Sequence, residues 1–206
     1  MAACHRRLAA TQRWLQKVVI GQRLCPWASP VAQPPRLRLH ATEHTAPDEL
    51  VAEVAREATL LRRGIEAHRG DMSGAAGVLE LPETTLLVLS REAAPEYMDL
   101  VRLSWRLQAE AILEGGHGAE LQLVLFHPLA VHSTYGEGPP DAADYSIRSP
   151  YPVVHLLREM DVLAAVSRYP NAAQVPHVNK ARLRAIGLAA CREQLLACDV
   201  EVPCAT

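Results

Sequence analysis

The chain is organised around residues 126–159, which open with Phe126-His127-Pro128 and close with Arg148-Ser149-Pro150-Tyr151-Pro152-Val153-Val154-His155-Leu156-Leu157-Arg158-Glu159. The apolar run at 121–126 has the length of a strand, so we expect that strand to deliver His127 at its end. A polar loop follows at 130–148. Because proline is tolerated in the first turn of a helix, the sequence predicts that Ser149 caps a helix running to about residue 167.

The spacing of apolar residues predicts the elements on either side of this stretch. Helices are expected at about 8–24, 45–65, 95–113 and 177–197, and strands at 36–40 and 84–89. Residues 66–82 lack periodicity and predict a surface loop. At least three strands interleaved with about five helices indicate one α/β or α+β domain at 8–198, a small sheet packed against helices, with a loose tail at 199–206.

Two of the helices have a clear expected buried stripe. The stripe of the helix at 45–65 comprises Leu50, Val51, Val54, Ala58, Leu61 and Ile65. The stripe expected for the helix at 95–113 comprises Met98, Val101, Trp105, Ala109 and Ile112. Both follow the 3.6-residue period of a helix with one face in the core.

Composition narrows the classes of function. The 206 residues carry a formal net charge of −2, with 49% hydrophobic and 21% charged residues, which is typical of a globular protein. No overall positive field exists to attract nucleic acid, so we do not expect a nucleic-acid partner. No apolar run approaches the ~18–20 residues that span a bilayer, so no membrane partner is expected either.

The N-terminal region is basic and contains no acidic residue before Glu43. Its basic residues are Arg6, Arg7, Arg13, Lys17, Arg23, Arg36 and Arg38. An arginine-rich, acid-free start is typical of an organellar transit segment, but residues from Leu8 onward have the pattern of a domain helix. We therefore expect a cytoplasmic protein, with the mitochondrial matrix as the alternative, and a surface in this basic region for a protein partner.

Three side chains suggest a metal site. His155 and Glu159 are four residues apart on the predicted helix and would share one face. This spacing can hold a divalent transition metal ion, with His127 as the third ligand. The alternative is a hydrogen bond between His155 and Glu159 that stabilises the helix.

Arg148 and Cys25 extend the candidate site. Arg148 precedes the predicted helix start, where free N–H groups and the helix dipole favour a small anionic ligand. Alternatively, Arg148 is bonded to Asp144 or to loop carbonyls. Cys25 would be a nucleophile if His127 or His155 came within hydrogen-bonding distance, and is otherwise a packing cysteine.

The chain resembles an uncharacterised family, domain-of-unknown-function family 1415, over roughly residues 10–187. The matching motifs are Trp14-Leu15, Val18-Val19-Ile20-Gly21, Leu24-Cys25-Pro26, Phe126-His127-Pro128, Arg148-Ser149-Pro150-Tyr151-Pro152 and His155-Leu156-Leu157-Arg158-Glu159. The resemblance implies no activity. It implies that Asp144, Tyr145, Ser149 and Arg158 belong with the residues above, and we assign these four to substrate binding beside Arg148.

Two hypotheses of function follow. In the first, the protein is an enzyme, most simply a hydrolase, acting on a small anionic substrate; His127 and His155 are acid, base or metal ligand, Glu159 orients them, and Cys25 is a nucleophile. Sequence motifs such as GxSxG, HExxH or a P-loop are absent. In the second, the protein is a binding or assembly module, a subunit of a larger complex, and the same residues lock the long loop onto the sheet.

Overall fold

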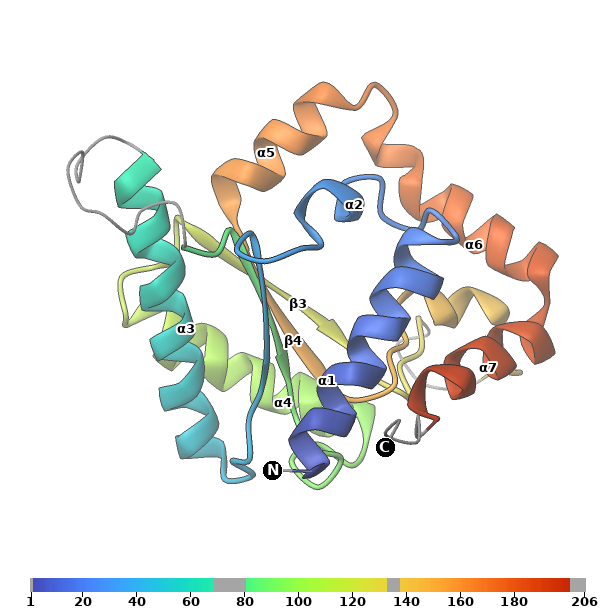
Figure 1. Ribbon diagram of the computed structural model, residues 1–206, viewed down its shortest axis with the longest axis horizontal. Coiled ribbons are helices and arrows are strands. Elements are labelled where there is room, and N and C mark those ends of the chain that lie inside the picture. The colour runs from blue at the N-terminus through green and yellow to red at the C-terminus, as the bar shows by residue number, and fades with distance from the viewer. Residues whose placement is uncertain (1, 69–80, 133–137, 201–206) are drawn as a thin grey trace, which may run out of the picture.

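The computed structural model describes residues 2–68, 81–132 and 138–200. Across these residues the strands form one mixed sheet with helices on both faces (Figure 1). The strands are β1 (Leu37–Ala41), β2 (Thr84–Val88), β3 (Leu121–Phe126) and β4 (Val153–Arg158), in the spatial order β1-β2-β4-β3. β1 pairs in parallel with β2, whereas β4 runs antiparallel to both of its neighbours. The prediction of one α/β domain with a small sheet is confirmed.

The helical elements follow the chain in order. They are α1 (Ala2–Trp14), η1 (Leu15–Ile20), α2 (Ala28–Val31), α3 (Pro47–His68), α4 (Tyr97–Arg106), η3 (Leu107–Leu113), η4 (Ala142–Ser146), α5 (Glu159–Arg168), η5 (Ala172–Gln174), α6 (Val175–Ile186), α7 (Leu188–Leu196) and η6 (Ala197–Asp199). In the described part of the chain, no helix combines the length and hydrophobicity needed to cross a membrane.

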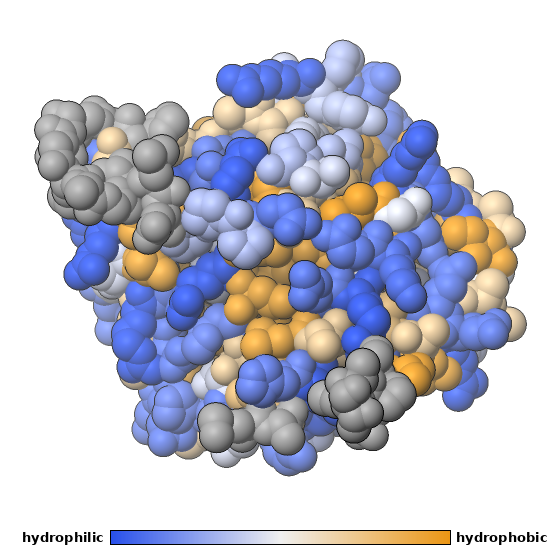
Figure 2. Space-filling view, viewed as in Figure 1, coloured by the Kyte–Doolittle hydropathy of each residue, from blue (hydrophilic) through white to orange (hydrophobic). Residues whose placement is uncertain are grey.

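Two hydrophobic cores lie on opposite faces of the sheet. α3 and α4 cover one face, where Leu61 of α3 meets Leu87 of β2 and Leu156 of β4. α1 covers the other face, where Trp14 packs among Val88 and Val153. Figure 1 shows α3 and α1 on either side of the strands. In Figure 2 hydrophobic residues reach the surface between these two helices, with hydrophilic residues around them.

The expected stripe of α3 is correct. Leu50, Val54, Ala58, Leu61 and Ile65 are all buried. Val51 is partly buried beside them. Apolar residues at the helical period therefore fixed the orientation of this helix on the sheet.

The helix expected from Ser149 to about residue 167 is wrong in its first half. Residues 153–158 form β4, and α5 begins only at Glu159. β4 is an inner strand: His155, for example, lies opposite Leu86 of β2 and Val124 of β3. The backbone N–H and C=O groups of β4 form hydrogen bonds to β2 and β3, which are distant in sequence. The sequence of a short apolar run does not reveal such partners, so it does not distinguish a strand from a helix.

The stripe expected for the helix at 95–113 is wrong except at Ile112, which is buried. Met98 and Trp105 are exposed, by 47% and 67%. The buried residues are instead Leu100, Leu103 and Leu107, which fit the same helical period rotated to another face. Large apolar residues on both sides of this helix made the period ambiguous.

Asp199 is part of the domain, although we expected it to begin a loose tail. Its carboxylate accepts hydrogen bonds from the Tyr151 hydroxyl at 2.9 Å, from Arg6 at 3.1 Å and from Arg91 at 3.1 Å. The rest of the expected tail, residues 201–206, lies outside the described residues, as does most of the loop expected at 66–82.

Replacing Leu156 by alanine tests the strand assignment. Leu156 is fully buried on β4, so we expect Leu156→Ala to lower the free energy of unfolding by about 2–5 kcal/mol. Leu163 lies on α5 with 59% of its surface exposed, and Leu163→Ala should change stability by less than about 0.5 kcal/mol. Urea denaturation of both variants provides the comparison, and equal effects would contradict the assignment.

Candidate functional site

A cleft of about 750 Å³ lies between the segment that follows η1 and helix α6. Arg23 and Cys25 line it from the first segment, and Asn179 and Arg182 line it from α6. Pockets of roughly 300–1,000 Å³ are typical of small-molecule sites. The cleft is therefore large enough to enclose an organic ligand.

Hydrogen bonds from side chains of α6 fix the backbone of residues 22–24, on the other side of the cleft. Arg182 donates from Nη1 to the carbonyl oxygens of Gln22, at 2.7 Å, and Arg23, at 3.0 Å. Asn179 donates from Nδ2 to the carbonyl oxygen of Leu24 at 2.6 Å. Arg23 adopts a left-handed backbone conformation, with φ of +56°. Such a conformation is uncommon for a residue with a side chain, so the surrounding contacts must hold it in place.

A second set of contacts ties the chain after Cys25 to the end of α5. The indole nitrogen of Trp27 donates to the carbonyl oxygen of Ala165 at 3.1 Å. The rings of Trp27 and Tyr169 meet edge to face, with centroids 5.6 Å apart. The cleft thus lies within a region fixed from two sides.

The lining of the cleft is cationic. Arg23 and Arg182 both contribute to it, and no aspartate or glutamate does. In the described part of the chain, the Arg23 guanidinium has no partner, and Arg182 uses only Nη1. The remaining N–H groups of both arginines are therefore available to an anion.

The Cys25 thiol is half-buried at this cleft. Burial raises the pKa of Cys25, although hydrogen bonds from the backbone of Trp27 and Ala28 act in the opposite direction. The thiol is therefore protonated at neutral pH. No histidine or carboxylate lines the cleft to deprotonate it, so the condition set for a nucleophilic Cys25, a hydrogen bond to His127 or His155, is not met.

His127 follows β3, as expected, but both of its hydrogen bonds are to backbone groups. Its exposed fraction is 1%. Nδ1 accepts a hydrogen bond from the Leu129 N–H at 3.0 Å, so Nε2 carries the proton and donates to the Ala94 carbonyl oxygen at 2.9 Å. Burial lowers the pKa of His127. Because both ring nitrogens are occupied, the side chain joins the loop after β2 to the turn after β3.

His155 and Glu159 lie on either side of a strand–helix junction. His155 Nε2 is 2.7 Å from Thr84 Oγ1, and that hydroxyl donates its single proton to the Leu156 carbonyl oxygen. Nε2 must therefore be the donor to Thr84. Glu159, the first residue of α5, accepts a hydrogen bond from the Gln122 side chain instead. The two residues do not share a helix face, and the structure shows no contact between them.

Arg148, Asp144 and Tyr145 do come together, in a network that fixes the long loop. Arg148 donates from Nε to the Ala130 carbonyl oxygen at 2.9 Å, and its guanidinium lies 4.8 Å from the centre of the Tyr145 ring. The Asp144 carboxylate accepts the His132 N–H at 2.9 Å and lies 3.7 Å from Arg148. This arrangement matches the alternative in which Arg148 is bonded to Asp144 and to loop carbonyls.

Ser149 and Arg158 lie outside this network. The buried Ser149 hydroxyl donates to the Tyr151 carbonyl oxygen at 2.5 Å. Arg158, at the end of β4, is 6% exposed and donates to Asp161 at 2.5 Å, while Glu83 lies 3.9 Å away. The nine candidate residues are thus divided among separate places rather than gathered in one pocket.

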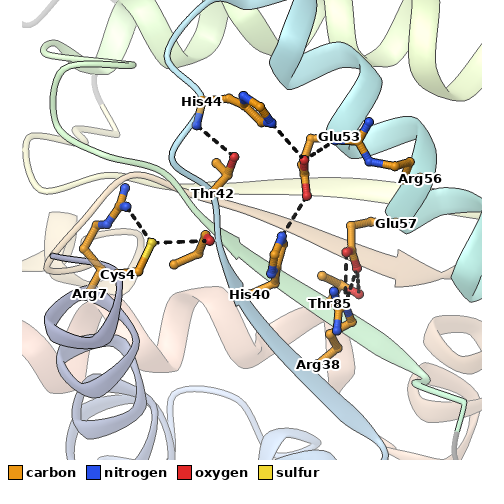
Figure 3. Close-up of polar contacts among 11 residues, drawn as sticks. Cys4, Arg7, Arg38, His40, Thr42, His44, Glu53, Arg56, Glu57 and Thr85 are labelled. Carbon is orange, nitrogen blue, oxygen red and sulfur yellow. Dashed lines mark hydrogen bonds and ion pairs between the residues drawn. The ribbon is translucent and has the colours of Figure 1, made fainter. Parts of the chain in front are cut away.

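A polar cluster on the α3 face of the sheet was not expected from the sequence. Within the described residues, one group of three or more histidine, cysteine or acidic side chains has its ligand atoms within 4.8 Å of one another: His40, Glu53 and Glu57 (Figure 3). The expected set of His127, His155 and Glu159 does not form such a group. The missed signal is a pair of acidic residues four apart beside the buried stripe of α3.

Five arginines of the basic N-terminal region contact other parts of the chain: Arg7, Arg36 and Arg38 pair with Glu43, Glu83 and Glu57, and Arg6 and Arg13 contact the C-terminal end. Arg13 donates to the carbonyl oxygens of Cys198, at 2.8 Å, and Val200, at 3.0 Å. Arg6 pairs with Asp199. These contacts join α1 to the C-terminal end of the described chain, so a protein partner at this surface stays a prediction.

The chain belongs to the family described as protein of unknown function (DUF1415), whose model matches residues 6–193. The match covers most of the chain and includes the cleft, the loop network and the polar cluster. No curated protein and no solved structure matches the chain.

The imidazole of His155, which is half-buried on β4, predicts a dependence of stability on pH. Burial lowers the pKa of His155 to about 4, below the ~6.5 of an unfolded histidine. Because the folded pKa is the lower one, its stabilisation is complete above pH 6.5 and is lost as the pH falls toward 4. Between pH 7 and pH 5, wild type should lose about 1–2 kcal/mol more unfolding free energy than His155→Gln. Parallel losses in the two proteins, measured by urea denaturation, would refute this role.

Proposed function

We propose, for this member of an uncharacterised family, that the cleft between η1 and α6 binds a small organic anion. The observation that carries the proposal is the lining itself: two arginines and no carboxylate around about 750 Å³. A guanidinium at a recessed site attracts carboxylate or phosphate strongly because it offers several N–H donors in one plane.

The orientation of Arg182 supports this proposal. Nη1 is already bonded to two carbonyl oxygens, which hold the guanidinium plane in place before any ligand arrives. Fixing a side chain in advance removes an entropic cost from binding. Arg23 is exposed on the facing segment, so it can close onto the ligand from the other wall.

The remaining lining indicates that the ligand is organic rather than a simple ion. Val178 and Tyr169 supply apolar and aromatic surface, and Asn179 supplies a buried amide. Small-molecule sites commonly combine mostly apolar walls with a few placed polar groups. A free phosphate or sulfate would leave most of the cleft volume unfilled.

Binding is favoured over nucleophilic catalysis by the state of Cys25. The raised pKa of its thiol leaves little thiolate at neutral pH, and the thiolate is the nucleophile. The enzyme hypothesis with Cys25 and a histidine therefore lacks its base. Cys25 is retained here as a residue that contacts the ligand.

The loop network supports the other part of the binding hypothesis. His127 and Arg148 donate hydrogen bonds to backbone carbonyl oxygens, and Arg148 also contacts Asp144 and Tyr145. Such contacts are expected of residues that fix a loop on the sheet. Assembly into a larger complex and a cytoplasmic location, with the mitochondrial matrix as the alternative, stay predictions.

Calorimetric titration with phenyl phosphate tests the proposal, because this probe carries one anionic group and one ring. Removing a charged hydrogen bond should weaken binding about tenfold or more, so we expect that loss in Arg23→Gln and in Arg182→Gln. Arg192→Gln replaces an exposed arginine of α7 outside the cleft and should bind like wild type. Inorganic phosphate and benzyl alcohol should each bind more weakly than phenyl phosphate.

Two results would contradict the proposal: no binding of any anionic probe, or equal binding in Arg23→Gln and Arg192→Gln. Arg23 makes no structural contact with its side chain in the described chain, so its replacement keeps the test valid even if Arg182→Gln unfolds.

Alkylation with iodoacetamide tests the state of Cys25. Cys25 should react faster than Cys191, which is 3% exposed, and its rate should keep rising about tenfold per pH unit from pH 7 to pH 9, because only the thiolate reacts. Peptide mapping identifies the modified residue. A rate that levels off below pH 8 would indicate a low pKa and would restore the nucleophile hypothesis.

A further inference from the structure

His40, Glu53 and Glu57 converge between β1 and α3. His40 projects from the edge strand β1 toward α3 (Figure 3). Glu53 and Glu57 are one turn apart on α3 and face the sheet, with exposed fractions of 8% and 4%. Two buried carboxylates side by side repel each other, so this arrangement requires nearby positive charge.

The spacing of the three groups is close to that of a metal site. His40 Nε2 lies 2.7 Å from Glu53 Oε1, and the ligand atoms of all three side chains lie within 4.8 Å of one another. Nitrogen and oxygen ligands at about 2.0–2.1 Å from a tetrahedral ion lie roughly 3.3 Å apart. Side-chain rotations that move the ligand atoms by about an ångström would therefore bring the three groups to one ion.

Two arginines supply the positive charge at present. Arg38 Nε donates to both carboxylate oxygens of Glu57, at 3.0 and 2.8 Å, and Arg56 pairs with Glu53. The side chains of Arg38 and Arg56 are 40% and 59% exposed, so both can turn into solvent while the carboxylates stay buried. Ion pairs with such exposed partners are weak, and a divalent ion can displace them.

A hydroxyl and a second histidine surround the group. Thr85 donates to Glu57 Oε2 at 3.2 Å, and His44 Nε2 lies 3.6 Å from Glu53 Oε2 (Figure 3). Partners of this kind fix the orientation of carboxylate ligands in metal sites. The cluster therefore has both candidate ligands and the groups that would orient them.

We propose that His40, Glu53 and Glu57 bind one divalent first-row transition metal ion, such as Zn²⁺ or Co²⁺. One imidazole with two carboxylates suits these ions, and a fourth position stays open to water. The site is on the face opposite α1 and shares no residue with the cleft, so it is independent of the proposed anion binding.

Titration of the chelator-treated full chain with Co²⁺ and Zn²⁺ tests the proposal. We expect one equivalent to bind with visible Co²⁺ absorption bands, and His40→Gln and Glu53→Gln to weaken the affinity at least about tenfold. Glu66→Gln, on α3 but outside the cluster, should bind like wild type. Circular dichroism checks that each variant is folded. If His40→Gln or Glu53→Gln does not fold, Glu57→Gln is tested in its place.

Arg38→Gln separates a metal site from a purely structural ion-pair cluster. If the metal competes with Arg38 for Glu57, this variant should bind Co²⁺ several-fold more tightly than wild type. No stoichiometric binding by wild type, or an affinity unchanged in both His40→Gln and Glu53→Gln, would overturn the proposal. Weaker binding in Arg38→Gln would also overturn it, since it would show that the arginine supports rather than competes with the ion.

Discussion

The pairing of β4 with both β2 and β3 is the constraint on which the rest of the structure depends. β4 is antiparallel to its two neighbours, and without it β3 would have no partner in the sheet. Its side chains alternate between the two cores, with Val153 on the α1 face and Val154 and Leu156 on the α3 face. α5 begins where β4 ends, and from there the chain turns back to α6 and the cleft. The position of the cleft therefore follows from the pairing of this strand.

Local pattern predicted the parts of the fold that local forces determine. The buried stripe of α3 follows the helical period, and the apolar run expected as a strand at 84–89 forms β2, which is buried throughout; both predictions were correct. β4 was missed because two prolines precede a short apolar run, which suits the start of a helix as well as an inner strand. Only pairing with residues far along the chain, such as Thr84 opposite Leu157, decides between the two. The same limit explains α4, where Trp105 is a large apolar residue that the sheet leaves exposed.

The candidate site could be predicted only in part, for the same reason. Cys25 does line a cleft, and Arg148 with Asp144 and Tyr145 does form a cluster, because these residues are close in sequence or belong to recognisable turns. Arg182, which lines the same cleft from α6, is far along the chain from Cys25, and no sequence pattern joins them. His40 and Glu53 meet because β1 is followed by a crossover helix, α3, that packs back onto the sheet. A contact of this kind can be predicted from sequence only when the buried faces of both the strand and the helix are already known.

The arginine-lined cleft is the proposed binding site for an organic anion. A crystal structure of the full chain grown with phenyl phosphate tests this proposal most directly. We expect the phosphate between the guanidinium groups of Arg23 and Arg182, with the ring against Tyr169 and Val178. Phenyl phosphate bound elsewhere on the protein, or a cleft left without it at saturating concentration, would contradict the account.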